Sequence, residues 1–116
     1  MEEIGIGEFA RRSRLSLKAL RLYDKRGVLV PSRVDRASGY RYYDTAQLDQ
    51  ARLVVMMREL QLPLKAVKQL LACDPADAAK RIAEHWRDAE AAHDARRELA
   101  DYLVSRLSGM LSLIHI

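Results

Sequence analysis

The chain has 116 residues, of which 49% are hydrophobic and 31% charged, and it carries a net charge of +4. This composition is typical of one globular domain with at most an extension. No apolar run approaches the roughly 18 residues of a membrane span, the Met-Glu-Glu start is acidic where a signal peptide is basic, and the single cysteine, Cys73, excludes an internal disulfide. We therefore expect a cytoplasmic protein without a membrane partner.

Two short helices joined by a tight turn are predicted near the N-terminus. After a short lead-in, the apolar-periodic run Ile6-Gly-Glu-Phe-Ala-Arg-Arg predicts a helix that ends near Ser13. A second helix is expected over residues 16–27, because Ser16 can cap its start and Gly27 suits the left-handed position after its last turn. Arg14 occupies the turn, where Gly or Asn would fit more easily. This is the pattern of a helix-turn-helix, whose second helix enters the major groove.

The second helix has one apolar side and one cationic side. The apolar side consists of Leu17, Leu20 and either Leu22 or Tyr23, and the outer arc carries Lys18, Arg21, Lys25 and Arg26. On a lone helix such an arc is most often only a solvated surface. The neighbouring turn and the hairpin that follows favour a DNA-binding helix instead.

A β-hairpin wing is predicted after Pro31, which prevents the second helix from continuing. Its two short strands lie around Arg33 and in Gly39-Tyr-Arg-Tyr-Tyr, with Gly39 free to adopt positive φ. Residues 11–41 include ten Lys or Arg and two Asp, which gives this segment a net charge of +8. From residue 64 onward, eight basic and eight acidic residues cancel. Positive charge concentrated on the helix-turn-helix and wing indicates a surface that neutralises DNA phosphates.

Two further helices complete the N-terminal part. Asp44-Thr-Ala-Gln matches a capping box with Gln in place of Glu and predicts a third helix to about Leu60. Its expected buried residues are Leu48, Ala51, Leu53, Val55, Met56 and Leu60. Pro63 lies at the start of a fourth helix, which should extend from Leu64 to about Ala72.

A long fifth helix is predicted from Asp74-Pro75 onward. Apolar positions recur every four or three residues through about four heptads, which indicates a coiled coil. Its seam cannot be buried by so small a domain, so we expect a second copy as partner. The residues assigned to dimerisation are Ile82, Trp86, Ala89, His93, Ala100, Leu103 and Leu107. His93 and Arg96 interrupt the seam, where polar residues more often fix the register than bind a metal.

Several blocks of the sequence resemble the MerR family of bacterial transcription regulators, and its multidrug-responsive branch in particular. The resemblance covers residues 4–108 and rests on Ile6-Gly-Glu-Phe-Ala, Leu20-Arg-Leu-Tyr-Asp-Lys-Arg-Gly, Pro31, Gly39-Tyr-Arg-Tyr-Tyr and the long terminal helix. It implies a mainly α fold, with a winged helix-turn-helix domain over residues 1–73 and a coiled-coil dimerisation helix over residues 74–110. The apolar residues 111–116 belong to neither part, and their origin is left open.

The resemblance also implies a function. Family members bind promoter DNA as homodimers and act on RNA polymerase indirectly, by distorting the DNA between the promoter elements, which would place this protein on the bacterial nucleoid. The positions carried over as DNA contacts are Ser16, Lys18, Arg21, Tyr23, Tyr40 and Arg41, to which Tyr42, Arg58 and the wing residue Arg36 are added. Leu22 departs from the paired tyrosines of drug-sensing relatives, so that either one phosphate contact is lost or Leu22 is buried.

Other function classes fit the sequence less well. Metal-sensing and redox-sensing members need several cysteines, and Cys73 stands alone, so no metal or other cofactor is expected. No phosphate-binding loop or nucleophile motif points to an enzyme. A coiled-coil interaction module without specific DNA binding is the alternative, but it leaves the basic wing unexplained. Drug-sensing members carry an effector domain after the long helix, so a small-molecule effector is expected to need a domain absent from these 116 residues.

Overall fold

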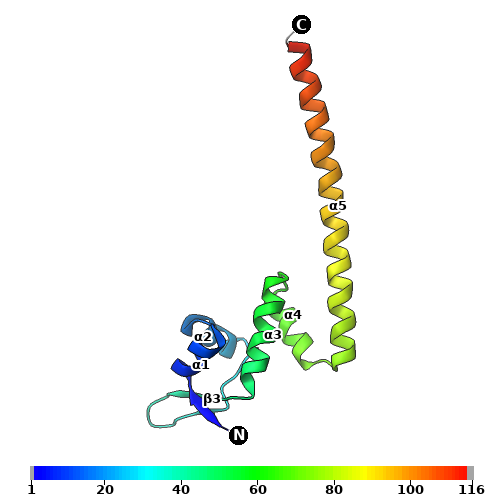
Figure 1. Cartoon of the computed structure of the whole chain (residues 1–116). Helices are drawn as coiled ribbons and strands as arrows, with labels where there is room; N and C mark the ends of the chain where they lie inside the picture. The colour runs from blue at the N-terminus through cyan, green and yellow to red at the C-terminus, as the bar shows by residue number, and fades with distance from the viewer. Residues whose placement is uncertain (1, 115–116) are drawn as a thin grey trace. The chain divides into compact units, whose positions relative to one another are not determined.

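The computed structural model describes residues 2–114, which form two compact units with the boundary between Cys73 and Asp74 (Figure 1). We refer to residues 2–73 as the head. In chain order, the elements are β1 (Glu3–Gly5), α1 (Ile6–Ser13), α2 (Leu17–Lys25), β2 (Arg33–Val34), β3 (Arg41–Asp44), α3 (Gln47–Glu59), α4 (Leu64–Ala72) and α5 (Pro75–Ile114). The predicted mainly helical fold, with its hairpin and its long C-terminal helix, is confirmed.

The helix-turn-helix of α1 and α2 is defined by local signals that the sequence displays. Arg14 adopts φ 64° in the turn, the left-handed conformation expected there. The Ser16 hydroxyl accepts the N–H of Ala19 at 2.9 Å and so caps α2. At the other end, the N–H groups of Gly27 and Val28 donate to carbonyls of the last turn at 3.0 and 2.8 Å, with Gly27 at φ 71°. This arrangement is a Schellman motif, and both predicted caps of α2 are confirmed.

The sheet has three antiparallel strands in the order β1-β3-β2. Its β2–β3 hairpin is the predicted wing, closed by a loop in which Asp35 accepts the Ser38 hydroxyl at 2.9 Å and Gly39 adopts φ 74°. The sequence did not reveal β1: the expectation that residues 1–5 are only a lead-in is wrong. Three residues carry too little alternation to predict a strand, and pairing with the distant β3 is what stabilises β1.

Helices α3 and α4 enclose the core of the head. Gln47 Oε1 accepts the N–H of Asp44 at 2.9 Å, and Asp44 Oδ1 accepts the N–H of Ala46. The predicted start of the helix is nevertheless wrong, because Asp44 is the last residue of β3 and α3 begins at Gln47, after Ala46, without a side-chain cap. Pro63 stands directly before α4, whose predicted bounds are confirmed. The prediction for α3 is partly wrong, because its apolar residues surround the helix and periodicity does not select one face. Ala51 is buried as expected, but Val54 and Met57 replace Leu53, Met56 and Leu60, which are exposed.

The second unit is the single helix α5, whose 40 residues extend for about 60 Å at the usual rise per residue. It includes the start of the predicted apolar tail, and residues 115–116 lie outside the described part of the chain. The large apolar residues of its C-terminal half are exposed in the single chain, among them Leu99, Leu103, Leu107 and Leu111. In the part of the chain that the structure describes, no helix is long and apolar enough to cross a membrane.

Candidate nucleic-acid interface

Helix α2 presents its cationic arc to solvent, as the sequence predicts. Lys18, Arg21, Lys25 and Arg26 are all exposed. The opposite side buries Leu20 and Tyr23 against the core, so Tyr23 is the apolar alternative that packs. Leu17 and Leu22 are 42% and 40% exposed. The expectation that Leu17 packs is therefore wrong, and so is the alternative that Leu22 is buried.

The burial of Tyr23 changes what this residue can contribute to an interface. Only 9% of its surface is exposed, because its ring points toward the core from the side of α2 opposite the cationic arc. Tyr23 was predicted as a DNA contact, and that role stays a prediction. Any contact of Tyr23 with DNA is restricted to its exposed edge.

Tyr40 is fixed at the junction between the wing and the first helix. Its side chain is 44% exposed, and its ring lies so close to Gly5 that a methyl group there would come within 2.8 Å of Tyr40 Oη. Gly5 is the residue that precedes α1, and no side chain caps that helix. The rings of Tyr40 and Tyr42 meet edge to face with centroids 5.1 Å apart. Two aromatic side chains predicted to contact DNA, from the residue before β3 and from β3 itself, are thereby held together.

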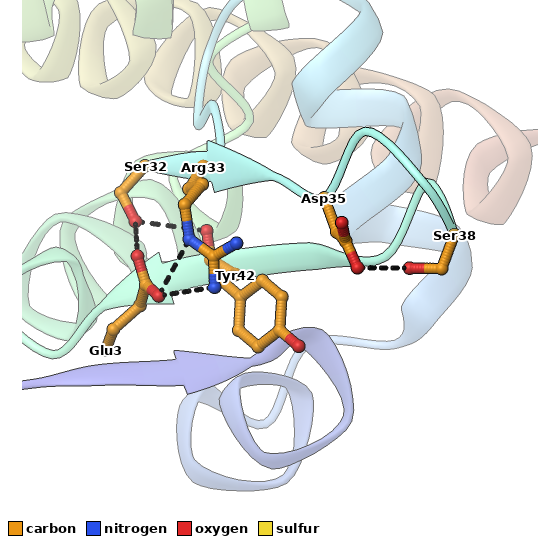
Figure 2. Close-up of polar contacts among 6 residues, drawn as sticks. All are labelled: Glu3, Ser32, Arg33, Asp35, Ser38 and Tyr42. Carbon is orange, nitrogen blue, oxygen red and sulfur yellow. Dashed lines mark hydrogen bonds and ion pairs between the residues drawn. The ribbon is translucent and has the colours of Figure 1, made fainter.

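Arg33 is neutralised within the sheet rather than free for phosphate. The Glu3 carboxylate accepts from Arg33 Nε at 3.1 Å and from Nη2 at 2.9 Å, and the guanidinium lies 4.1 Å from the centroid of the Tyr42 ring (Figure 2). The Ser32 hydroxyl joins this cluster by donating to the Tyr42 carbonyl at 3.1 Å. Hydrogen bonding to Glu3 raises the pKa of Arg33. This cluster ties β1, β2 and β3 together at one position of the sheet.

Arg41 also has an intramolecular partner, on the second helix of the helix-turn-helix. Its Nε donates to Asp24 Oδ2 at 2.9 Å, which connects β3 to α2. The side chains of Arg41 and Asp24 are 36% and 22% exposed, so solvent screens this pair less than a fully exposed one. Arg41 was predicted as a DNA contact, but its Nε is already engaged.

The remaining basic residues of the segment form the available positive surface. Ten basic residues lie between positions 11 and 41, and seven of them have no ion pair within residues 2–114. These seven are Arg12, Arg14, Lys18, Arg21, Lys25, Arg26 and Arg36. Arg36 belongs to the loop of the wing. Arg58, on α3, was also predicted as a DNA contact. Its Nη1 donates to the Leu62 carbonyl at 2.6 Å, beyond the end of α3. The surface is therefore centred on α2, with contributions from the turn and the wing.

A hollow that the sequence did not predict lies between the end of α1 and the side of α3. Its volume is about 520 Å³, and it is lined by Arg12, Ser13, Arg14, Leu48, Arg52 and Val55. Arg52 pairs only loosely with Asp49, at 3.8 Å between exposed side chains. The basic residues Arg12 and Arg14 are visible in the sequence. Their proximity to Arg52 depends on how α1 packs against α3.

The residues predicted for dimerisation are all on α5, in the second unit. Trp86, Leu103 and Leu107 are 46–56% exposed, and Ile82 and Ala89 are half-buried. His93 and Ala100 are exposed as well. The apolar side chains are thus available to a partner, as the predicted coiled coil requires.

Comparison with known proteins agrees with this geometry. The family model described as MerR HTH family regulatory protein matches residues 5–73. Transcriptional regulator BrlR of Pseudomonas aeruginosa is 38% identical over 77 residues, which are 66% of this chain and 28% of that protein. The multidrug-efflux transporter 1 regulator of Bacillus subtilis is 38% identical over 64 residues, covering 55% of this chain and 23% of its own. The chain thus spans about a quarter of the length of these relatives.

The solved structures that match include a cryo-EM structure of an EcmrR–DNA complex. It is 27% identical, with a TM-score of 0.58, and the match covers 74% of this chain and 34% of that one. A MerR-family regulator from Bacillus cereus has a TM-score of 0.67 at 19% identity over 88% of this chain and 78% of its own, which shows the shared fold alone.

Proposed function

Because the chain belongs to the MerR family of helix-turn-helix regulatory proteins, we propose that it is a transcriptional regulator that binds promoter DNA sequence-specifically. The observation that carries the proposal is the set of unpaired cations on α2, its preceding turn and the wing. These elements are the ones that a winged helix places against a duplex. The solved EcmrR–DNA complex supports the same assignment.

The individual roles follow from the chemistry and exposure of each side chain. Lys18 and Arg21 project from the exposed arc of α2 and can reach base edges or phosphates in the major groove. Tyr40 and Tyr42 offer hydroxyl donors for phosphate oxygens, and Arg36 extends positive charge to the tip of the wing. Ser16 and Arg58 have local hydrogen bonds of their own, so their roles in DNA binding are secondary.

The proposed DNA-binding form is a homodimer paired through α5. Packing of α5 against the α5 of a second copy would bury the exposed apolar residues of the seam, and His93 would lie within it. Two heads joined in this way would occupy successive half-sites, and distortion of the promoter between them would act on RNA polymerase. A cytoplasmic location on the nucleoid follows from this role.

The alternative of an interaction module without specific DNA binding is less well supported. It accounts for α5 but gives no role to the cationic arc or the wing. The membership in a family of regulatory proteins also argues against an enzyme.

Fluorescence anisotropy with the full chain tests the proposal. We would select a duplex with the chain from a randomised library and compare it with a shuffled duplex across a range of salt concentrations. The selected duplex should bind more tightly, and log K should fall by about 0.9 for each phosphate contact per tenfold increase in salt. Equal affinity for both duplexes, or an affinity independent of salt, would contradict the proposed function.

A further inference from the structure

The basic segment contains two acidic residues, and the structure gives each of them an intramolecular partner. Between residues 11 and 41, Asp24 and Asp35 are the acids among ten basic residues. Asp35 shapes the wing loop by accepting the Ser38 hydroxyl at 2.9 Å and the Ala37 N–H at 3.2 Å, and these hydrogen bonds lower its pKa. A carboxylate on a DNA-binding surface opposes phosphate binding, so its presence there requires another explanation.

Asp24 lies on α2, the helix that carries Lys18 and Arg21. Its carboxylate reaches across to β3 and accepts Arg41 Nε at 2.9 Å, a charge-assisted hydrogen bond between residues 17 positions apart. Arg41 stands between Tyr40 and Tyr42, whose side chains share the opposite face of the strand. The ion pair therefore joins α2 directly to β3, the strand on which Tyr42 lies and which Tyr40 directly precedes.

The core below the pair makes this connection rigid. Tyr43 lies on the same face of β3 as Arg41 and is fully buried, with its ring stacked on Phe9 of α1. The Asp24 and Arg41 side chains are themselves only 22% and 36% exposed. A turn of β3 about its own axis would break the ion pair and displace Tyr43 together.

We propose that Asp24 is a positioning residue for DNA recognition: through Arg41 it sets the orientation of the wing aromatics relative to Lys18 and Arg21. This inference rests on the proposed DNA-binding function. It assigns Arg41 a role in geometry, where the sequence predicted a direct contact. Sequence-specific binding depends on this geometry, because base contacts and backbone contacts must be made in one register.

The substitution Asp24→Asn gives a test in which charge and geometry predict opposite results. It removes one negative charge, so electrostatics alone predicts tighter binding to every duplex. The positioning role predicts that affinity for the duplex selected by the wild-type chain falls roughly tenfold, while affinity for the shuffled duplex is unchanged or rises. Asp49→Asn is the matched control, because it makes the same charge change in the exposed, loosely paired Asp49 on α3. The control should preserve the ratio of the two affinities.

A double-mutant cycle with Arg41→Gln completes the test. If Arg41 acts through Asp24, the double variant should bind the selected duplex no more weakly than the weaker single variant. Additive losses would show that Arg41 contacts DNA independently, and an unchanged affinity ratio in Asp24→Asn would overturn the inference. If Asp24→Asn loses its cooperative thermal transition, Arg41→Lys replaces it, since this change keeps the charge but removes the Nε donor. A wild-type chain that fails to discriminate between the duplexes would instead refute the proposed function.

Discussion

The ring of Phe9 stacks on the ring of Tyr43 with centroids 4.3 Å apart and an angle of 14° between their planes. Both side chains are fully buried, and they join α1 to the central strand of the sheet. The Tyr43 hydroxyl, however, has no hydrogen-bond partner within the described residues. A contact that unites the helix-turn-helix with the wing thus carries an unsatisfied polar atom.

Tyr43→Phe should leave the unfolding free energy unchanged or raise it by about 1 kcal/mol, because it removes a buried hydroxyl without a partner. Burial raises the pKa of Tyr43 above its ordinary value near 10. At alkaline pH the unfolded state therefore loses this proton first, so wild-type stability should fall as pH rises through about 10. Denaturant titrations at pH 7 and pH 10.5 should show a smaller loss in Tyr43→Phe. A large loss of stability in this variant at pH 7 would contradict the finding that the Tyr43 hydroxyl has no hydrogen-bond partner.

Arg21→Ala should weaken binding to the selected duplex by about 1–3 kcal/mol and broaden sequence preference if Arg21 pairs with a guanine edge. Arg87→Ala on α5 removes the same charge outside the head and should have little effect. Anisotropy with single-base variants of the duplex measures both. Equal weakening on selected and shuffled duplexes would identify Arg21 as a phosphate contact only.

Leu103→Asp should convert the dimer to monomers, because it places an unpaired carboxylate in the apolar seam of α5. Ser105→Asp introduces the same charge on the opposite side of the helix and should remain dimeric. Sedimentation velocity distinguishes the two states. A dimeric Leu103→Asp variant would show that the interface lies elsewhere.

These 116 residues should bind DNA without responding to lipophilic cations. The hollow beside α1 has a volume of about 520 Å³, within the range of roughly 300–1,000 Å³ for ligand sites, but three arginines line it and would repel a cation. Isothermal titration with a panel of such cations should give no saturable signal. A stoichiometric isotherm that also changes DNA affinity would refute this, since coupling between two sites is reciprocal.

Much of the head could be predicted from the sequence because its signals are local. Ser16, Gly27 and Gly39 act through the backbone within a few residues of their own positions, and the structure shows each in the expected conformation. Pro63 likewise marks the start of α4. The concentration of positive charge between residues 11 and 41 is also a property of the sequence itself, and the structure shows the basic residues of α2 exposed.

Tertiary structure decided the features that depend on residues distant in the chain. Strand β1 forms because β3, about forty positions later, supplies its hydrogen-bond partners. Packing selected Tyr23 over Leu22 for the core and a different face of α3 than the apolar pattern indicated. The sequence by itself does not show that Arg33 and Arg41 have acidic partners, whereas in the folded chain Arg33 pairs with Glu3 and Arg41 pairs with Asp24. Periodicity identifies which residues are close along one helix or strand, whereas ion pairs between elements depend on distances that only the folded chain defines.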